Sequence, residues 1–119
     1  MEVHRLSKLA LQKILQGKVD GEITCVIKFY SNGCHYCHEL HEPYTKLAEE
    51  YEDLYFFAFN IGDYPEVEDI VGFEGIPTIC LVKTGTNIPS RRLIAEPDTP
   101  HKKTWYHMKD IRKFIEREK

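Results

Sequence analysis

The sequence lacks the features that place a protein in a membrane or send it out of the cell. Its 119 residues contain no apolar run of the length that a membrane-spanning helix needs. Residues 1–5 lack the apolar core of a secretory signal peptide. For an unprocessed chain, these absences predict a cytoplasmic location and no membrane partner.

A large charge of one sign is also missing. The chain has 16 Lys and Arg residues against 19 Asp and Glu residues, which gives a formal net charge of −3. Domains that bind nucleic acid or anionic membranes usually carry a strong positive charge. We therefore expect no nucleic-acid partner.

Cysteine is too scarce for a scaffold held together by disulfides. There are four cysteines in the chain, without a secretion signal. Cys34 and Cys37 are separated by two residues, a spacing found in redox pairs and in halves of zinc sites. Cys25 and Cys80 lie in apolar runs, where a free cysteine packs as a small hydrophobic residue. The pattern predicts a redox or metal-binding pair at 34 and 37 and two core cysteines.

The apolar content is sufficient for one hydrophobic core. Hydrophobic residues make up 42% of the chain, and no repeat, linker or low-complexity tract divides it, so we expect a single domain over residues 1–119. Apolar periodicity predicts strands at 3–6, 24–30, 54–60, 75–82 and 91–94, and helices at 8–16, 34–51, 63–71 and 105–115. This order predicts an α/β fold with a central mixed sheet and helices on both faces.

Several boundaries carry their own signals. Ser7 is a suitable N-cap for the first helix, and Gly17 ends it. Pro43 is expected to kink the second helix, and Pro65 suits the first turn of the third. Thr104 is expected to cap the last helix. Residues 83–86 are expected to form a hairpin turn.

Cys34 and Cys37 lie where a predicted strand gives way to a predicted helix. Gly33 ends the strand, and both cysteines fall in the first turn of the helix. A helix N-terminus offers unpaired N–H groups and a positive dipole end, which stabilise a thiolate. We expect Cys34 to attack a partner disulfide and Cys37, one turn deeper, to resolve the mixed disulfide.

Two motifs resemble those of the thioredoxin family, one at this corner and one at the start of a later strand. They are Cys34-His35-Tyr36-Cys37 and Gly75-Ile76-Pro77-Thr78. The resemblance covers about residues 3–85 and the final helix, and it implies the thioredoxin fold. It also implies a protein-disulfide reductase that works through its own Cys34–Cys37 disulfide, without a bound cofactor. Its partners would be disulfide-containing proteins and a separate thioredoxin-type reductase that recycles it, in electron transport and cell redox homeostasis.

The resemblance further implies where the substrate binds. It places a cis Ile76–Pro77 bond against the Cys34 sulfur, with the Ile76 backbone available to pair with an extended substrate segment. Around that groove, specificity would come from Gly33, His35 and Tyr36.

The chain departs from the family near its cysteines. Gly33 stands where thioredoxins usually carry tryptophan, and the His35-Tyr36 spacer differs from the family's usual pairs. Lys28 occupies the strand position of the family's buried acid. Either Lys28 lies near Cys37 and favours its thiolate by charge, or it extends to solvent. His35 is expected to stabilise the Cys34 thiolate as a cation, unless it is merely exposed.

Further along, residues 93–103 form a longer segment than the family normally has, which suggests a partner-specific loop. The single tryptophan, Trp105, is expected in the core of the last helix. Arg91 and Arg92 are expected on a solvated strand face.

The same residues could also serve other functions. A metal site would draw on His35, His38 and His41, but His38 and His41 lack the four-residue spacing of a zinc-protease helix, so we expect no metal. An oxidase or isomerase would use the same two cysteines, and a non-catalytic binding module would use the same groove. Because the cytosol is reducing, we expect substrate reduction.

Overall fold

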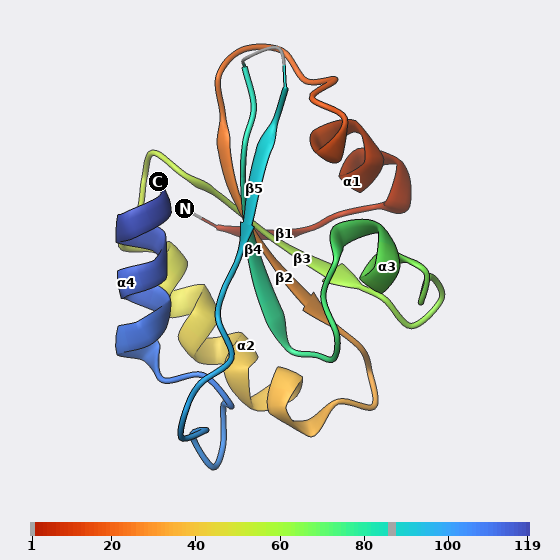
Figure 1. The fold of residues 1–119 in the computed structure, drawn as a ribbon. Coiled ribbons are helices and arrows are strands. Elements are labelled where there is room, and N and C mark those ends of the chain that lie inside the picture. The colour runs from red at the N-terminus through yellow and green to blue at the C-terminus, as the bar shows by residue number, and fades with distance from the viewer. Residues whose placement is uncertain (1, 86–87) are drawn as a thin grey trace.

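The computed structural model describes residues 2–85 and 88–119. Its elements, labelled in Figure 1, follow in chain order: β1 (Val3–Arg5), α1 (Lys8–Leu15), β2 (Thr24–Tyr30), α2 (His35–Ala48), β3 (Tyr55–Asn60), α3 (Val67–Val71), β4 (Thr78–Lys83), β5 (Ser90–Leu93) and α4 (Met108–Glu118). Within this described part, none of the helices has the length and apolar character that crossing a bilayer requires.

The five strands form one sheet in the order β1-β3-β2-β4-β5. β1 and β2 are parallel to β3, whereas β4 is antiparallel to both β2 and β5. Helices α1 and α3 lie on one side of the sheet and α2 and α4 on the other (Figure 1). The predicted α/β fold with a mixed sheet between two helical layers is confirmed.

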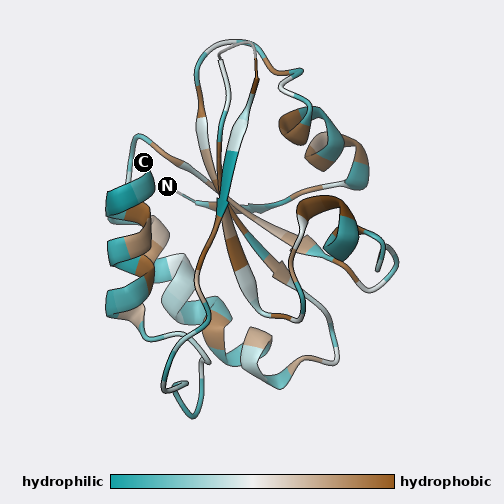
Figure 2. Ribbon diagram, viewed as in Figure 1, coloured by the Kyte–Doolittle hydropathy of each residue, from teal (hydrophilic) through white to brown (hydrophobic). Residues whose placement is uncertain are grey.

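Each face of the sheet has its own core, because successive side chains of a strand point to opposite faces. Val26 and Phe56 pack with residues of α2 and α4, whereas Ile27 and Phe29 pack with residues of α1 and α3. Figure 2 shows that the helices combine polar and apolar segments, as helices that cover a sheet should, and that the edge strand β5 is largely polar. Lys28 is a charged residue among the apolar side chains of β2. It lies on the α2 face and is only 1% exposed.

Many local signals of the sequence are confirmed. The Ser7 hydroxyl caps α1 by accepting a hydrogen bond from the Ala10 amide at 3.1 Å, and Gly17 follows the helix with a positive φ of 72°. Pro43 lies inside α2, and the kink there stays a prediction. The β4–β5 hairpin is present, with Lys83 paired to Ser90, although Thr86 of the predicted turn lies outside the described residues.

The third helix is shorter than predicted. It begins at Val67 rather than at residue 63. The side-chain oxygen of Asn60 accepts a hydrogen bond from the Gly62 amide at 2.8 Å, which stabilises a turn in competition with helix. Residues 62–66 therefore form turns, with Pro65 before the helix.

The start of the last helix also differs from the prediction. Thr104 does not cap α4, because its hydroxyl donates to the Tyr106 carbonyl at 2.7 Å. Trp105 has a φ of 65°, in the left-handed region, and it exchanges backbone hydrogen bonds with His101. These local bonds form a tight turn, so α4 begins only at Met108, with His107 as its N-cap. Trp105 is consequently outside the helix and is half-buried.

Candidate active site

Cys34 and Cys37 form a disulfide at the N-terminus of α2, with their Cα atoms 5.2 Å apart. Cys34 is the N-cap, with an extended backbone, and its Sγ accepts a hydrogen bond from the Cys37 amide at 3.1 Å. Cys34 is half-buried, whereas Cys37 is buried at 2% exposure. The strand-to-helix corner is as predicted, with Cys34 the more accessible sulfur and supplied with a backbone N–H that would stabilise its thiolate.

The Ile76–Pro77 bond is cis, as the resemblance implied. Phe29, near the end of β2, pairs with Thr78 at the start of β4. This pairing places Pro77 at the end of the sheet where β2 leads into Cys34. Pro77 is buried and Ile76 is half-buried.

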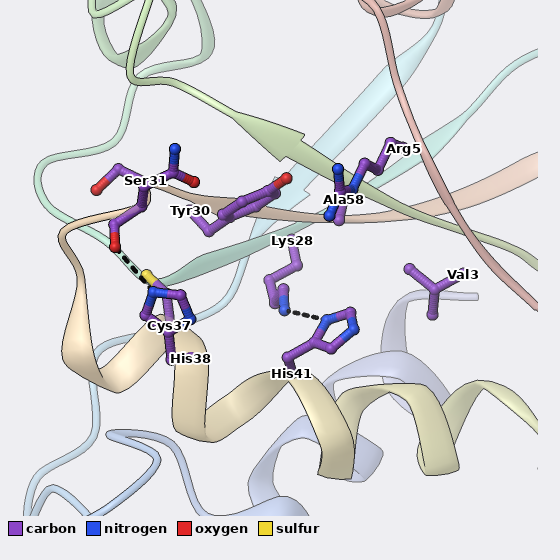
Figure 3. A pocket seen from close by; sticks show the side chains of 10 residues that line it. Val3, Arg5, Lys28, Tyr30, Ser31, Cys37, His38, His41 and Ala58 are labelled. Carbon is purple, nitrogen blue, oxygen red and sulfur yellow. Dashed lines mark hydrogen bonds between the residues drawn. The ribbon is translucent and has the colours of Figure 1, made fainter.

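Beside Cys37 lies a pocket between α2 and the β1 side of the sheet (Figure 3). It is lined by Val3, Arg5, Lys28, Tyr30, Ser31, Asn32, Cys37, His38, His41 and Ala58. The Nζ atom of Lys28 lies 3.2 Å from Nδ1 of His41, and the two side chains point toward each other. Of the two positions expected for Lys28, the structure shows the one in the pocket shared with Cys37 rather than the one in solvent.

The pKa values in this pocket follow from burial and from an excess of basic groups. Burial lowers the pKa of Lys28 to about 8. The pKa of His41 is also lowered, first by burial and then by the neighbouring charges of Lys28, Arg5 and His38. When Lys28 is charged, its ammonium can only donate, so Nδ1 of His41 accepts and the proton of the neutral ring is on Nε2.

The other predicted specificity residues surround the disulfide. Gly33 is exposed, and a Cβ atom there would meet nothing within 4 Å. His35 is exposed, with its ring centroid 6.0 Å from that of Tyr36, so its effect on the Cys34 thiolate stays a prediction. The Tyr36 ring lies edge-on to the ring of Trp105, with centroids 5.4 Å apart.

This contact brings to the site the segment between β5 and α4, which the sequence analysis singled out for its length but did not place beside the cysteines. Trp105 also donates from Nε1 to Glu96 at 2.7 Å, and the hydroxyl of Tyr106 donates to the Pro77 carbonyl at 3.1 Å. The segment between β5 and α4 thus contacts both Tyr36 of the cysteine motif and the cis-proline loop. The unusual length of this segment was the only sign in the sequence that it has a role at the site. The helical spacing of Trp105 and Met108 wrongly placed Trp105 in the last helix.

The histidines near the cysteines have separate partners. His38 contacts the Asn32 carbonyl through Nε2 at 2.8 Å, whereas His41 contacts Lys28. Among the residues that the structure describes, no group of three or more His, Cys, Asp or Glu side chains could hold a metal ion.

Cys25 and Cys80 are free and fully buried. Burial raises the pKa of each thiol to about 12, so neither forms a thiolate near neutral pH. We predict that iodoacetamide, applied to the reduced native protein, modifies Cys34 first and leaves Cys25 and Cys80 unmodified until the protein is unfolded in urea. Peptide mass spectrometry checks this. Labelling of Cys25 or Cys80 at the rate of Cys34 would contradict it.

Comparisons with known proteins agree with this geometry. The family model described as Thioredoxin matches residues 3–98. Thioredoxin AMT13 of Alternaria alternata is 28% identical over 71 residues, which cover 60% of this chain and 59% of that protein. The chloroplastic Thioredoxin M3 of Oryza sativa subsp. japonica is 31% identical over 65 residues, covering 54% of this chain and 37% of that protein. The matches thus span less than two thirds of either relative.

Solved structures show the same fold. A chain in the crystal structure of a complex between ferredoxin:thioredoxin reductase and thioredoxin f2 superposes with a TM-score of 0.72. The sequence identity is 20%, and the match covers 98% of this chain and 94% of that chain.

Proposed function

Because this chain belongs to the thioredoxin family, we propose that it is a thiol–disulfide oxidoreductase that reduces protein disulfides through Cys34 and Cys37. The observation that carries the proposal is the Cys34–Cys37 disulfide at the start of α2, with the Cys37 amide directed at the Cys34 sulfur. A sulfur in this position is held where backbone dipoles stabilise a thiolate, which is the attacking species in disulfide exchange.

The reaction has two exchange steps. The Cys34 thiolate attacks one sulfur of the substrate disulfide, so the substrate S–S bond breaks and the first substrate thiolate leaves. The Cys37 thiolate then attacks Cys34 Sγ, so the mixed disulfide breaks and the second substrate thiolate leaves. Two electrons pass from the dithiol to the substrate, and the Cys34–Cys37 disulfide forms.

Around the cysteines, Gly33, His35 and Tyr36 would border the substrate chain, and Ile76 and Pro77 would orient it. The half-buried Ile76 and the open space above Gly33 support this assignment. An extended substrate segment would pair with the Ile76 backbone like an added strand.

Lys28 and His35 would tune the thiols. Lys28 is the stronger candidate, because it is buried in the pocket that Cys37 lines. Its positive charge would favour the Cys37 thiolate, in contrast to a carboxylate at the same place.

The partners would be proteins with reducible disulfides and a separate reductase that returns Cys34 and Cys37 to the dithiol state. The structural neighbour named above comes from a complex of ferredoxin:thioredoxin reductase with thioredoxin f2, which supports a partner of this kind. We place the protein in the cytoplasm, where free buried thiols such as Cys25 and Cys80 persist without oxidation.

The test is turnover. Wild-type protein should accelerate the reduction of a disulfide-linked protein, such as insulin, by dithiothreitol, with a rate proportional to its concentration. A Cys34→Ser/Cys37→Ser double variant should show no acceleration, while a Cys80→Ala variant, which also loses a thiol, should retain it. A wild-type chain that binds the substrate as tightly as the double variant and never accelerates reduction would be a binding module instead.

A further inference from the structure

The buried position of Cys37 raises the question of where its proton goes. Cys37 must become a thiolate before it can resolve a mixed disulfide. Its side chain is only 2% exposed, so bulk water does not surround the sulfur. A buried thiol that has to ionise during a reaction needs a neighbouring group that takes up the proton.

Lys28 is the titratable group best placed to do this. Its side chain and that of Cys37 line the same pocket, one from the sheet and one from α2 (Figure 3). Lys28 forms no ion pair with a carboxylate among the described residues. Its hydrogen-bond partner is Nδ1 of His41, at 3.2 Å.

His41 connects this buried amine to water. It is exposed, although Lys28 beneath it is only 1% exposed. His41 follows Cys37 by four residues in α2, so the imidazole and the thiol lie on the same side of the helix. The Cys37 thiol and the Lys28–His41 pair therefore share one pocket, and His41 is the exposed member of the pair.

The other groups that face Lys28 do not compete for this role. From α2 the Tyr44 ring lies 5.2 Å from Nζ, and from β2 the Tyr30 ring lies 5.6 Å from it. Arg5 of β1 and His38 of α2 complete the titratable lining of the pocket, which contains no carboxylate among the described residues. Burial raises the pKa of Tyr44 well above its usual range, so this phenol keeps its proton.

We propose that Lys28 and His41 form the path by which the proton of the Cys37 thiol reaches solvent, and that the resulting Lys28 cation holds the Cys37 thiolate ready to attack Cys34. The proposal rests on the oxidoreductase function and adds to it the residues that make the resolving step fast. His41 is a new assignment, because the sequence analysis considered it only as a metal ligand.

The proton transfers balance as follows. Cationic Lys28 gives a proton to Nδ1 of His41, and the imidazolium releases its Nε2 proton to water. The neutral Lys28 amine then takes the proton of the Cys37 thiol. The net result is a thiolate beside an ammonium ion and one proton in solvent. A pKa of about 8 for Lys28 makes the neutral amine accessible near physiological pH.

The experiment separates the two exchange steps with one reagent. When reduced protein is mixed with 5,5′-dithiobis(2-nitrobenzoate), Cys34 releases the first thionitrobenzoate and Cys37 releases the second as it resolves the mixed disulfide. This leaving group departs easily, so removal of the Cys37 proton limits the second phase. Stopped-flow absorbance at several pH values gives both rates.

We expect His41→Asn to leave the first phase unchanged and to slow the second by about 100-fold, the lower end of the usual range for loss of proton transfer. His41→Ala should behave alike, and added imidazole should restore its second phase. His38→Asn is the matched control, because His38 lines the same pocket without contacting Lys28. Its second phase should remain within about twofold of wild type.

An unchanged second phase in His41→Asn would overturn the proposal, and so would equal slowing in His38→Asn or a lack of imidazole rescue. Failure of the oxidoreductase function itself would look different. In that case wild-type protein would release no second thionitrobenzoate at all, at any pH.

Discussion

Cys37→Ser protein should accumulate as a covalent complex with its substrate, whereas Cys34→Ser protein should form none. In the first variant, Cys34 still attacks the substrate disulfide, but no second thiol is present to release it. In the second, the attacking sulfur is lost and Cys37, at 2% exposure, is too buried to replace it. Steady-state turnover of Cys34→Ser protein should fall by about 10⁴-fold or more, the scale seen when a covalent nucleophile is removed.

Non-reducing electrophoresis and intact-mass spectrometry after incubation with a disulfide-linked protein measure the complex. It should disappear on addition of dithiothreitol. Cys37→Ser/Cys80→Ala is the matched control and should trap as much substrate as Cys37→Ser alone, because Cys80 is buried in the sheet. Equal trapping by Cys34→Ser and Cys37→Ser would contradict the division of roles between the two sulfurs.

Lys28→Met should make the folded protein more stable at pH 7 while it slows the resolving step. Burial lowers the pKa of Lys28 from its ordinary value of 10.5 to about 8, a difference worth about 3 kcal/mol. Between these pH values the unfolded chain keeps the Lys28 proton and the folded chain releases it, so the unfolding free energy rises with pH. Below pH 8 the folded protein bears the full cost of a buried charge without a carboxylate partner.

Urea denaturation of the oxidised protein at pH 7 and at several values up to pH 10.5 tests this. The unfolding free energy of wild type should gain about 3 kcal/mol relative to Lys28→Met over that interval. Lys46→Met is the control, because Lys46 is an exposed residue of α2 paired with Glu42, and it should change the stability by less than about 1 kcal/mol. A Lys28→Met protein that is less stable than wild type at pH 7 would show that the cation stabilises the fold.

The sequence allowed the central half of the molecule to be predicted because its signals are local. The apolar strand, Gly33 and the helical spacing after Cys37 specify β2, the corner and α2, and short-range hydrogen bonds such as that from Cys37 to Cys34 follow from them. The cis bond at Pro77 could be predicted only from the resemblance, since no local pattern requires it.

Other features depend on contacts between segments that are distant in the sequence. Lys28 and His41 are 13 residues apart and meet only because α2 packs on the sheet, so the sequence did not decide between a buried and a solvent-facing Lys28. Trp105 shares helical spacing with α4, but the turn bonds of Thr104 and His101 prevent helix there. Its contact with Tyr36 joins two parts of the chain almost seventy residues apart.

The reduction potential of the Cys34–Cys37 pair tests the proposed function most directly. Equilibration with mixtures of reduced and oxidised glutathione, followed by alkylation and mass spectrometry, gives the oxidised fraction at each ratio. A cytoplasmic protein-disulfide reductase should show a two-electron transition near about −270 mV. A transition near about −180 to −120 mV would contradict the direction of electron flow and indicate an oxidase or isomerase, and no reversible disulfide at any ratio would contradict the redox function altogether.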